Sequence, residues 1–185
     1  MSINIKQNCL FLWNLIDPIY FQFTRLRFIK NTFGEKTIIR VRITRYKGEK
    51  VTLADGTVIN KNDFLLKIHL HNVKLLRQLQ KYDSDIKRAF ITYKHVQESL
   101  PSVIQYIQAN VYANRIKGLI GITSMHKGCK RLGFEVHTIQ SPYYRAFKRI
   151  SFFPIYKLSS PKGKRIPDPV YLFMSMDGLF KKYKK

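Results

Sequence analysis

Apolar and polar residues alternate most regularly in the stretch 64–71. Successive side chains of a strand point to opposite faces, so one face of a strand here is predicted to be apolar and to point to the core. That face holds Phe64, Leu66, Ile68 and Leu70. The opposite face holds Leu65, Lys67, His69 and His71. The pattern therefore predicts a strand with one buried face and one chemically rich face.

A second alternating stretch runs from Thr37 to Tyr46. Its apolar and polar positions separate onto two faces: Ile39, Val41 and Ile43 against Arg40, Arg42 and Thr44. Farther on, Asp55-Gly56 is a hairpin-turn dipeptide, because glycine tolerates positive φ and aspartate can bond its own backbone. Short strands at 51–53 and 57–59 flank this turn. We therefore expect an antiparallel meander from Thr37 to Leu70.

Helical periodicity follows the strand that ends near residue 71. Asn72 stands where an N-cap is expected, ahead of a helix over 73–80. A longer pattern covers 84–110, and Pro101 predicts two helices that meet near 99–101, because proline lacks the N–H that a helix interior uses. A further helix is predicted over 143–153, with Arg145, Lys148 and Arg149 opposite Phe147, Ile150 and Phe153.

The second half of the chain adds strands to the sheet. A buried strand is predicted at 117–123, then a short helix at 125–132 that Gly133 stops, then a strand at 134–139. Strand, helix and strand in this order predict a parallel pair with a tight crossover. An edge strand is expected at 171–174 and a basic tail helix at 177–185.

These elements together predict the α+β class, with a small, mostly antiparallel sheet and helices packed against it. At 185 residues the chain fits one domain over 1–185. Two segments of that domain stand out by composition. One is an aromatic and basic N-terminal segment at 1–30, expected to be helical, and the other is a proline-rich basic C-terminal segment at 154–185.

The charge of the chain indicates what kind of partner it binds. Thirty-four Lys and Arg against eleven Asp and Glu give a formal net charge of +23 at pH 7. Such a field attracts polyanions: nucleic acid, anionic lipid headgroups or anionic envelope polymers, and composition alone does not choose among them. The residues that we expect to bind anions are Arg25, Arg27, Arg40, Arg42, Arg131, Arg145, Lys148 and Arg149.

The aromatic stretch 9–24 fits neither a secretory signal nor a spanning helix, because polar residues and Pro18 interrupt its apolar run. Two interpretations stay open. In the first, the stretch is a pair of core helices broken near Asp17-Pro18. In the second, it is an interfacial helix whose aromatic side chains sit among lipid headgroups. The residues expected to contact a membrane are Trp13, Tyr20 and Phe147.

His69 and His71 are the leading candidates for chemistry, as two metal ligands or two oxyanion donors on one strand. A metal site needs further ligands, and no spacing rule joins these histidines to the available ones, namely Asp63, His126, Glu135 and His137. We therefore assign no metal and name no cofactor. The candidate catalytic residues are His69, His71 and Glu135. The alternative is two partly buried histidines that bond their neighbours.

Two further features were weighed as chemistry. Cys9 and Cys129 are the only cysteines, so no disulfide framework can be read. Cations near Cys129 can activate a thiol, but a small residue facing the sheet is the competing interpretation. The phrase 131–136, Arg-Leu-Gly-Phe-Glu-Val, resembles the late strand of GNAT-type acetyltransferases, whose R/Q-x-x-G-x-G/A pyrophosphate-binding pattern is absent here.

Several blocks in a fixed order resemble the YkoP-like family of spore-forming bacteria, over nearly the whole chain. They are Trp13–Pro18, Thr44–Gly48, Asp55–Thr57, Asn62–Asn72, Lys117–Thr123 and Arg131–Val136. The resemblance aligns His69 with the family's histidine in D-x-x-x-E-L-H-L-x-N. Lys67 stands where many relatives carry an acid, so a carboxylate–histidine pair is not expected here. Similar domains are fused to polysaccharide deacetylases, which implies an envelope context.

Three functions remain open at this point. The first is a peripheral protein on the cytoplasmic, inner face of a bacterial membrane, which binds anionic lipid or an anionic envelope polymer. It would be accessory to glycan modification, beside a polysaccharide deacetylase or a glycosyltransferase. The second is a transferase or hydrolase that uses His69 and His71 on a phosphate-bearing or glycan substrate. The third, less expected because no RNA-binding signature is present, is a nucleic-acid-binding protein.

Overall fold

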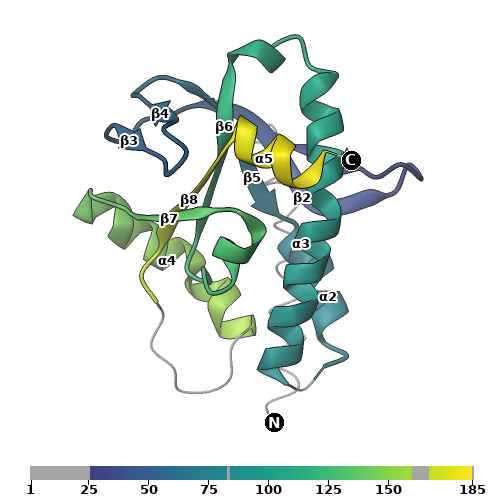
Figure 1. Cartoon of the computed structure of the whole chain (residues 1–185). Helices are drawn as coiled ribbons and strands as arrows, with labels where there is room; N and C mark the ends of the chain where they lie inside the picture. The colour runs from purple at the N-terminus through teal and green to yellow at the C-terminus, as the bar shows by residue number, and fades with distance from the viewer. Residues whose placement is uncertain (1–25, 83, 160–166, 185) are drawn as a thin grey trace.

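The computed structural model describes residues 26–82, 84–159 and 167–184 (Figure 1). A six-stranded mixed sheet has the order β1-β2-β5-β6-β8-β7. Its strands are β1 (Arg27–Lys30), β2 (Lys36–Arg45), β5 (Phe64–Leu70), β6 (Ile116–Thr123), β7 (Glu135–Thr138) and β8 (Val170–Ser175). Neighbouring strands run antiparallel except for the central pair β5 and β6, which run parallel.

The two faces of this sheet carry different elements (Figure 1). One face packs against α2 (Asn72–Leu79), α3 (Asp85–Gln108) and α5 (Met176–Tyr183). The other face carries α4 (Pro142–Ser159) and a separate hairpin of β3 (Val51–Thr52) and β4 (Val58–Ile59). Two 3₁₀ turns, η1 (Ala113–Arg115) and η2 (Cys129–Leu132), precede β6 and β7. The α+β class with a mostly antiparallel sheet is confirmed.

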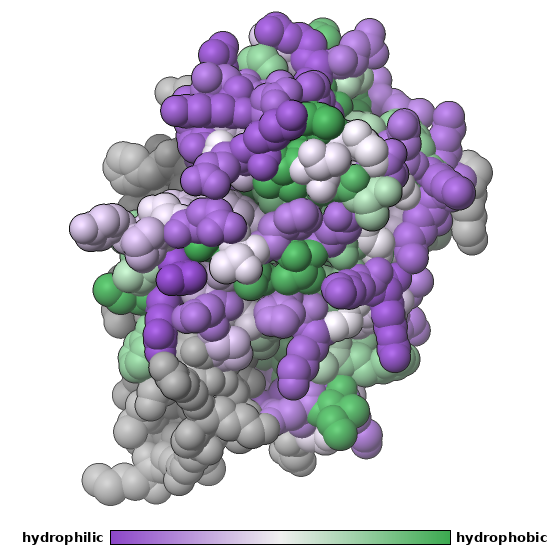
Figure 2. Space-filling model, turned by 60° about the vertical axis from the view of Figure 1, so that its left-hand side comes forward, coloured by the Kyte–Doolittle hydropathy of each residue, from purple (hydrophilic) through white to green (hydrophobic). Residues whose placement is uncertain are grey.

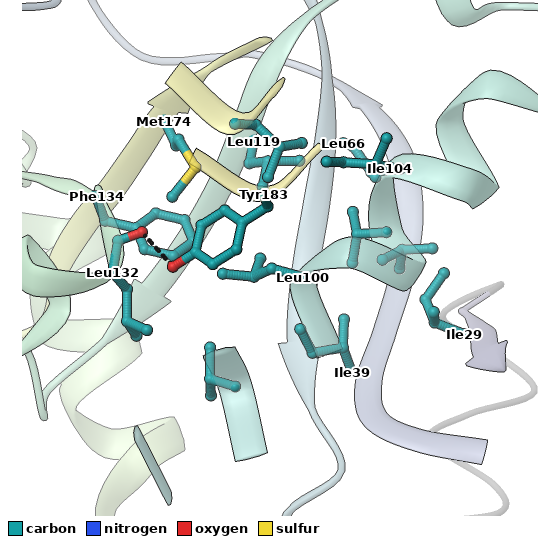
Figure 3. Packing of buried hydrophobic residues seen from close by; sticks show 14 of the residues in the cluster. Ile29, Ile39, Leu66, Leu100, Ile104, Leu119, Leu132, Phe134, Met174 and Tyr183 are labelled. Atoms are coloured by element: carbon teal, nitrogen blue, oxygen red, sulfur yellow. Dashed lines mark hydrogen bonds between the residues drawn. The ribbon is translucent and has the colours of Figure 1, made fainter. Parts of the chain in front are cut away.

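The main core lies between the sheet and α3 (Figure 3). Leu100 and Ile104 of α3 face Ile39 of β2 and Leu66 of β5, and each of them is buried. The tail helix α5 closes this core with Leu179 and Tyr183, whose hydroxyl donates a hydrogen bond of 2.9 Å to the carbonyl oxygen of Leu132 (Figure 3). The predicted basic tail is thus a helix that is anchored in the core.

A smaller core lies on the opposite face, beneath the β3–β4 hairpin. It is formed by Tyr46, Leu53, Ile59, Leu65, Ile120 and Phe173. The predicted turn at its tip is confirmed, because Gly56 has a φ of +84° and the amide of Thr57 donates to the side chain of Asp55. The expected continuous meander is wrong, because β2 pairs directly with β5 and the hairpin forms a sheet of its own. The sheet is therefore covered on both faces.

Two predictions about strand neighbours are corrected. The strand at 171–174 was expected at an edge, yet β8 lies between β6 and β7 and pairs antiparallel with both. Consequently β6 and β7 are not neighbours, and the predicted parallel pair between them is wrong. The close fit of β8 depends on Gly118, because a Cβ there would lie 2.5 Å from the carbonyl oxygen of Met174.

Helix predictions also change in detail. α3 is one helix with Pro101 inside it rather than two helices. Burial explains this continuity, since residues on both sides of the proline, such as Val96 and Ile104, pack on the same sheet and outweigh the loss of one hydrogen bond. α2 begins at Asn72 itself, with His71 at the N-cap position. The helix expected over 125–132 is only the turn η2, which ends at Gly133 as predicted.

Candidate functional site

The chemically rich face of β5 is completed by β2. In the antiparallel register of these strands, Arg40 lies opposite His69 and Arg42 lies opposite Lys67. Directly opposite residues share a face and have Cβ atoms about 5 Å apart. The two alternating patterns read from the sequence therefore combine into one cluster of two arginines, one lysine and one histidine. Their exposed fractions are small, and Arg40 is buried.

The parallel pair β5 and β6 parts beside this cluster. Its pairing runs from Phe64 opposite Ile116 to Lys67 opposite Ile120. Beyond Lys67, the residues of β5 pair with β2 only, up to Leu70 opposite Ile39. Lys67 and His69 therefore lie where the central strands of the sheet separate. Ligands commonly bind at the carboxyl ends of parallel strands in open sheets, which makes this a candidate site.

α4 brings a further cation to the same face. Lys148 is half-buried on the side of α4 that faces the sheet. Its ammonium group lies 5.3 Å from the ring centre of Tyr144 and 5.4 Å from that of Phe147. Tyr144 in turn lies 6.4 Å from Tyr171 of β8, centre to centre. These contacts fix α4 over the sheet, with Lys148 close enough to Lys67 for their charges to interact.

The cluster is electrostatically strained. Burial, followed by the positive charges of Lys148 and Arg42, lowers the pKa of Lys67 to about 8. Burial, followed by the charge of Lys67 and of the other cations, lowers the pKa of His69 to about 3, so its imidazole is neutral at pH 7. The Nε2 atom of His69 is buried and has no hydrogen-bond partner. Such an unsatisfied group costs about 1–3 kcal/mol of stability.

Carboxylates that could balance Lys67 and His69 are engaged elsewhere in the described part of the chain. Asp63 pairs with Lys117 at 2.9 Å, and Asp168 lies 3.6 Å from Arg149. Asp55 accepts a short hydrogen bond from Ser175, which lowers the pKa of its carboxyl group. No acidic side chain of the described residues forms an ion pair with Lys67 or His69. Within the described residues, Lys67 and His69 therefore lack a carboxylate partner.

Glu135 does not lie with the two histidines. It belongs to β7, three strands away from β5 in the sheet order. One oxygen of its carboxylate accepts a hydrogen bond of 2.8 Å from the amide of Ala54, and the other lies 3.5 Å from Nε2 of His137. Glu135 thus holds the tip of the β3–β4 hairpin to the sheet. His69 lies with Arg40, Arg42 and Lys67 instead, and the ring of His71 lies 5.5 Å from that of Phe28, centre to centre. Sequence reasoning had left Lys67 out of the candidate site.

The predicted anion-binding residues do not all lie at one site. Arg40, Arg42 and Lys148 converge on the cluster, whereas Arg27 is exposed on β1 and Arg131 is exposed in η2, away from it. Arg145 and Arg149 are half-buried on α4. The residues Trp13, Tyr20 and Arg25 lie outside the described residues. The segment 1–30 does not end in a helix, because Arg27–Lys30 form the strand β1.

α4 has its apolar face outward, which the sequence pattern could not tell. Tyr143 is 89% exposed, Phe147 59% and Ile150 75%, and Phe153 is also exposed. These positions lie on one side of the helix, while the basic residues Arg145, Lys148 and Arg149 are half-buried on the other. Figure 2, which brings this side of the molecule forward, shows hydrophobic residues as green patches on a mostly hydrophilic surface. An outward apolar face on a helix indicates a binding surface.

The described residues give little support for a metal site or for a reactive thiol at Cys129. No group of three or more His, Cys, Asp or Glu side chains gathers there to hold a metal ion. Burial raises the pKa of the Cys129 thiol to about 11, so the thiolate form is rare at neutral pH. The interpretation of Cys129 as a small residue that packs against the core fits this environment. Within the described ranges, no helix is long and apolar enough to cross a bilayer.

The fold and its cluster define a class: a basic α+β protein with a mixed sheet and a cationic site where the two parallel strands part. The chain belongs to the YkoP domain family, whose model matches residues 6–183. It is 48% identical to the "Uncharacterized protein YkoP" of Bacillus subtilis (strain 168) over 183 residues, 98% of this chain and 99% of that protein. No solved structure matches the chain. The family resemblance is thus confirmed, while the link to polysaccharide deacetylases stays a prediction.

Proposed function

We propose that this protein is a peripheral membrane protein that binds anionic lipid at the inner face of a bacterial membrane through α4. The observation that carries the proposal is the outward apolar face of that helix, in which Tyr143, Phe147 and Ile150 are each more than half exposed. Helices that lie in a membrane interface present such a face to the acyl boundary and keep cationic residues beside it. An accessory role in glycan modification stays a prediction from the family resemblance.

Charge supports an anionic membrane as the occupant of this face. The chain carries +23 at pH 7, and the partly exposed Arg145 and Arg149 belong to the same helix, on the side away from the apolar face. Each basic residue near an anionic leaflet contributes about 1 kcal/mol to binding. Two copies of the chain would repel each other through the same charge, which disfavours pairing of two α4 faces. Aromatic residues such as Tyr143 and Phe147 are also those that prefer the headgroup region.

The experiment is vesicle co-sedimentation of the full chain with and without Phe147→Glu/Ile150→Glu. We expect binding to vesicles that contain phosphatidylglycerol, weak binding to phosphatidylcholine alone, and a loss of at least about tenfold in the double variant. Full burial of one such side chain is worth about 1.5–3 kcal/mol, so even partial insertion of two accounts for that factor. Because both side chains are exposed, the melting temperature should not change.

A matched control is available on the turn between α3 and β6, far from α4 (Figure 1). Val111 there is 93% exposed, so Val111→Glu adds one negative charge to an equally accessible apolar position, as each of the single variants Phe147→Glu and Ile150→Glu does. This variant should bind vesicles as the natural chain does, apart from the small effect of one added negative charge. Equal losses in the control and in the α4 variant would show that net charge alone drives binding and would refute the role of α4.

A second candidate function, acyl transfer of the GNAT type, is favoured by one specific observation. The resemblance seen at Arg131–Val136 is accompanied by a mixed sheet. In it, antiparallel strands meet one central parallel pair that parts, and the last strand lies between β6 and β7. The pyrophosphate-binding pattern is absent at the start of α2. Calorimetry with coenzyme A tests this candidate, which fails if no binding is seen at millimolar coenzyme.

A further inference from the structure

We propose that Lys67, His69 and Lys148 form a binding site for a phosphate group, on the face of the sheet that α4 covers. The site is distinct from the outward face of α4 and does not depend on membrane binding. Three elements supply it: β5 gives Lys67 and His69, α4 gives Lys148, and β2 lines the far side with Arg42 opposite Lys67. The ligand would bind beside the point where the pairing of β5 with β6 ends, beyond Lys67.

The arrangement of like charges is the first argument. Lys67 and Arg42 are cross-strand neighbours, and like charges in that position destabilise a sheet. Lys148 approaches the same pair from α4, and the ammonium groups of Lys67 and Lys148 repel each other. Folding brings the two ammonium groups together, although no described acidic side chain forms an ion pair with Lys67 or Lys148. Two lysines that approach each other on one face of the sheet, both with a lowered pKa, are suited to bind an anion.

The second argument is the state of His69. Its Nε2 atom is buried without a hydrogen-bond partner in the cluster. At neutral pH its imidazole is uncharged, so one ring nitrogen donates and the other accepts a hydrogen bond. A phosphate oxygen placed between Lys67 and Lys148 would give that nitrogen an acceptor. The one ligand thus satisfies the unpaired nitrogen and separates the like charges.

The burial of the site favours a phosphate group over a polymer. Lys67, His69 and Lys148 are all half-buried, on the facing sides of the sheet and of α4, so a nucleic acid duplex cannot reach all three. A phosphate or pyrophosphate carries about two or more negative charges on a compact group and offers several acceptor oxygens, which matches several cationic donors at once. A single carboxylate would leave most of that charge uncompensated. The site therefore fits the phosphate end of a small soluble ligand or of a lipid headgroup.

Calorimetric titration with pyrophosphate, at constant ionic strength, tests the site in the full chain. We expect one saturable site in the natural chain and an affinity at least tenfold weaker in Lys67→Met and in Lys148→Met. The matched control is Lys61→Met, which removes the same charge from an exposed position next to the β4–β5 turn. Tenfold weakening in the control as well, or undiminished binding in both site variants, would overturn the proposal.

Thermal unfolding gives an independent readout and guards against a variant that misfolds. Lys67→Met should raise the melting temperature of the ligand-free protein, because it removes a charge from a half-buried cationic cluster. The same variant should lose the increase in melting temperature that pyrophosphate gives to the natural chain. If pyrophosphate stabilises Lys67→Met and Lys148→Met as much as the natural chain, the ions act on the surface charge in general and the proposed site is wrong.

Vesicles distinguish the two sources of a phosphate group. If saturating pyrophosphate releases the protein from phosphatidylglycerol vesicles, and Lys67→Met abolishes that effect, the site holds a lipid headgroup. If the protein binds vesicles and pyrophosphate together, the site holds a soluble ligand. Both outcomes keep the phosphate site. Failure of vesicle binding with retained pyrophosphate binding rejects the membrane role of α4 alone, so the two proposals can fail separately.

Discussion

His69 is kept neutral by its surroundings, which ties the stability of the fold to pH. Burial is the first cause of its lowered pKa of about 3, and the charges of Lys67, Arg42, Lys148 and Arg40 add to it. An unfolded histidine has a pKa of about 6.5. Between these values the unfolded chain binds more protons than the folded chain, so the free energy of unfolding falls as pH drops from about 6.5 toward 3.

We therefore predict that His69→Gln flattens the acid limb of the stability curve. Between pH 6.5 and 4.5 the natural chain should lose roughly 2 kcal/mol more than the variant, since each pH unit below the unfolded pKa contributes about 1.4 kcal/mol. Urea unfolding at a series of pH values measures this difference. His126→Gln, outside the cluster, is the control and should keep the natural slope. Parallel curves for all three chains would contradict the assignment.

At the level of single residues, much of the site was open to prediction. The period of two in 64–71 correctly placed Lys67 and His69 on one face, and the period in Thr37–Tyr46 placed Arg40 and Arg42 together. Phe64 departs from the pattern, because the register shifts after it and its ring lies against the guanidinium groups of Arg45 and Arg115. The residues of β5 do not indicate which strands it pairs with. Glu135 was therefore wrongly expected near the two histidines.

At the level of elements, β6 shows how a missing side chain sets a strand's neighbour. A Cβ at Gly118 would lie 2.5 Å from the carbonyl oxygen of Met174, which is backbone and cannot move aside. A Cβ at Gly121 would make ordinary contacts of 3.6 Å with Ile68 and Leu172. Both glycines belong to the same strand, and neither has a positive φ.

We predict that Gly118→Ala destabilises the fold by about 1–3 kcal/mol, as overpacking usually does, while Gly121→Ala changes stability little. For a chain of this size the first change corresponds to a melting temperature lower by roughly 2–12 °C. Differential scanning calorimetry on both variants measures it. Equal melting temperatures for the two alanine variants would show that β6 and β8 can separate slightly at no cost, contrary to the packing described.

Element order was the part that local sequence could not give. β8 is apolar enough to be buried on both faces, and four of its six residues are buried. However, the residues 170–175 do not indicate that β6 and β7 are the strands it pairs with. Likewise Pro101 predicts a helix end by local rules, and only the continuous apolar contact of α3 with the sheet overrides it. Long-range packing decided both cases.

At the level of the whole molecule, the large positive charge means that many anions will bind, and salt separates the modes. Binding to nucleic acid through phosphate contacts alone should fall steeply as salt rises. Binding to phosphatidylglycerol vesicles should instead leave a salt-resistant part, because apolar residues of α4 enter the interface. Co-sedimentation from about 50 to 500 mM NaCl compares the two curves. A vesicle curve as steep as that of a DNA duplex would favour purely electrostatic attraction.

Trp13 offers a second measurement at this scale, because it is the only tryptophan of the chain. If the aromatic segment around it enters the interface, its fluorescence should shift to the blue with vesicles rich in anionic lipid, and less with neutral lipid. An emission spectrum that is blue-shifted in the free protein and does not change with vesicles supports the other interpretation, a pair of core helices. Phe147→Glu/Ile150→Glu, measured in parallel, separates the contribution of α4 from that of this segment.

The central position of β8 has a consequence for how the protein is made. Among the described strands, β7 pairs with β8 alone and β6 has β8 on one side, so both keep unpaired edges until residues 170–175 leave the ribosome. Unpaired apolar edges recruit other strands and promote aggregation. During translation the sheet of the nascent chain is therefore incomplete until β8 is synthesised. Binding of chaperones to the nascent chain should be strongest just before β8 emerges and pairs with β6 and β7.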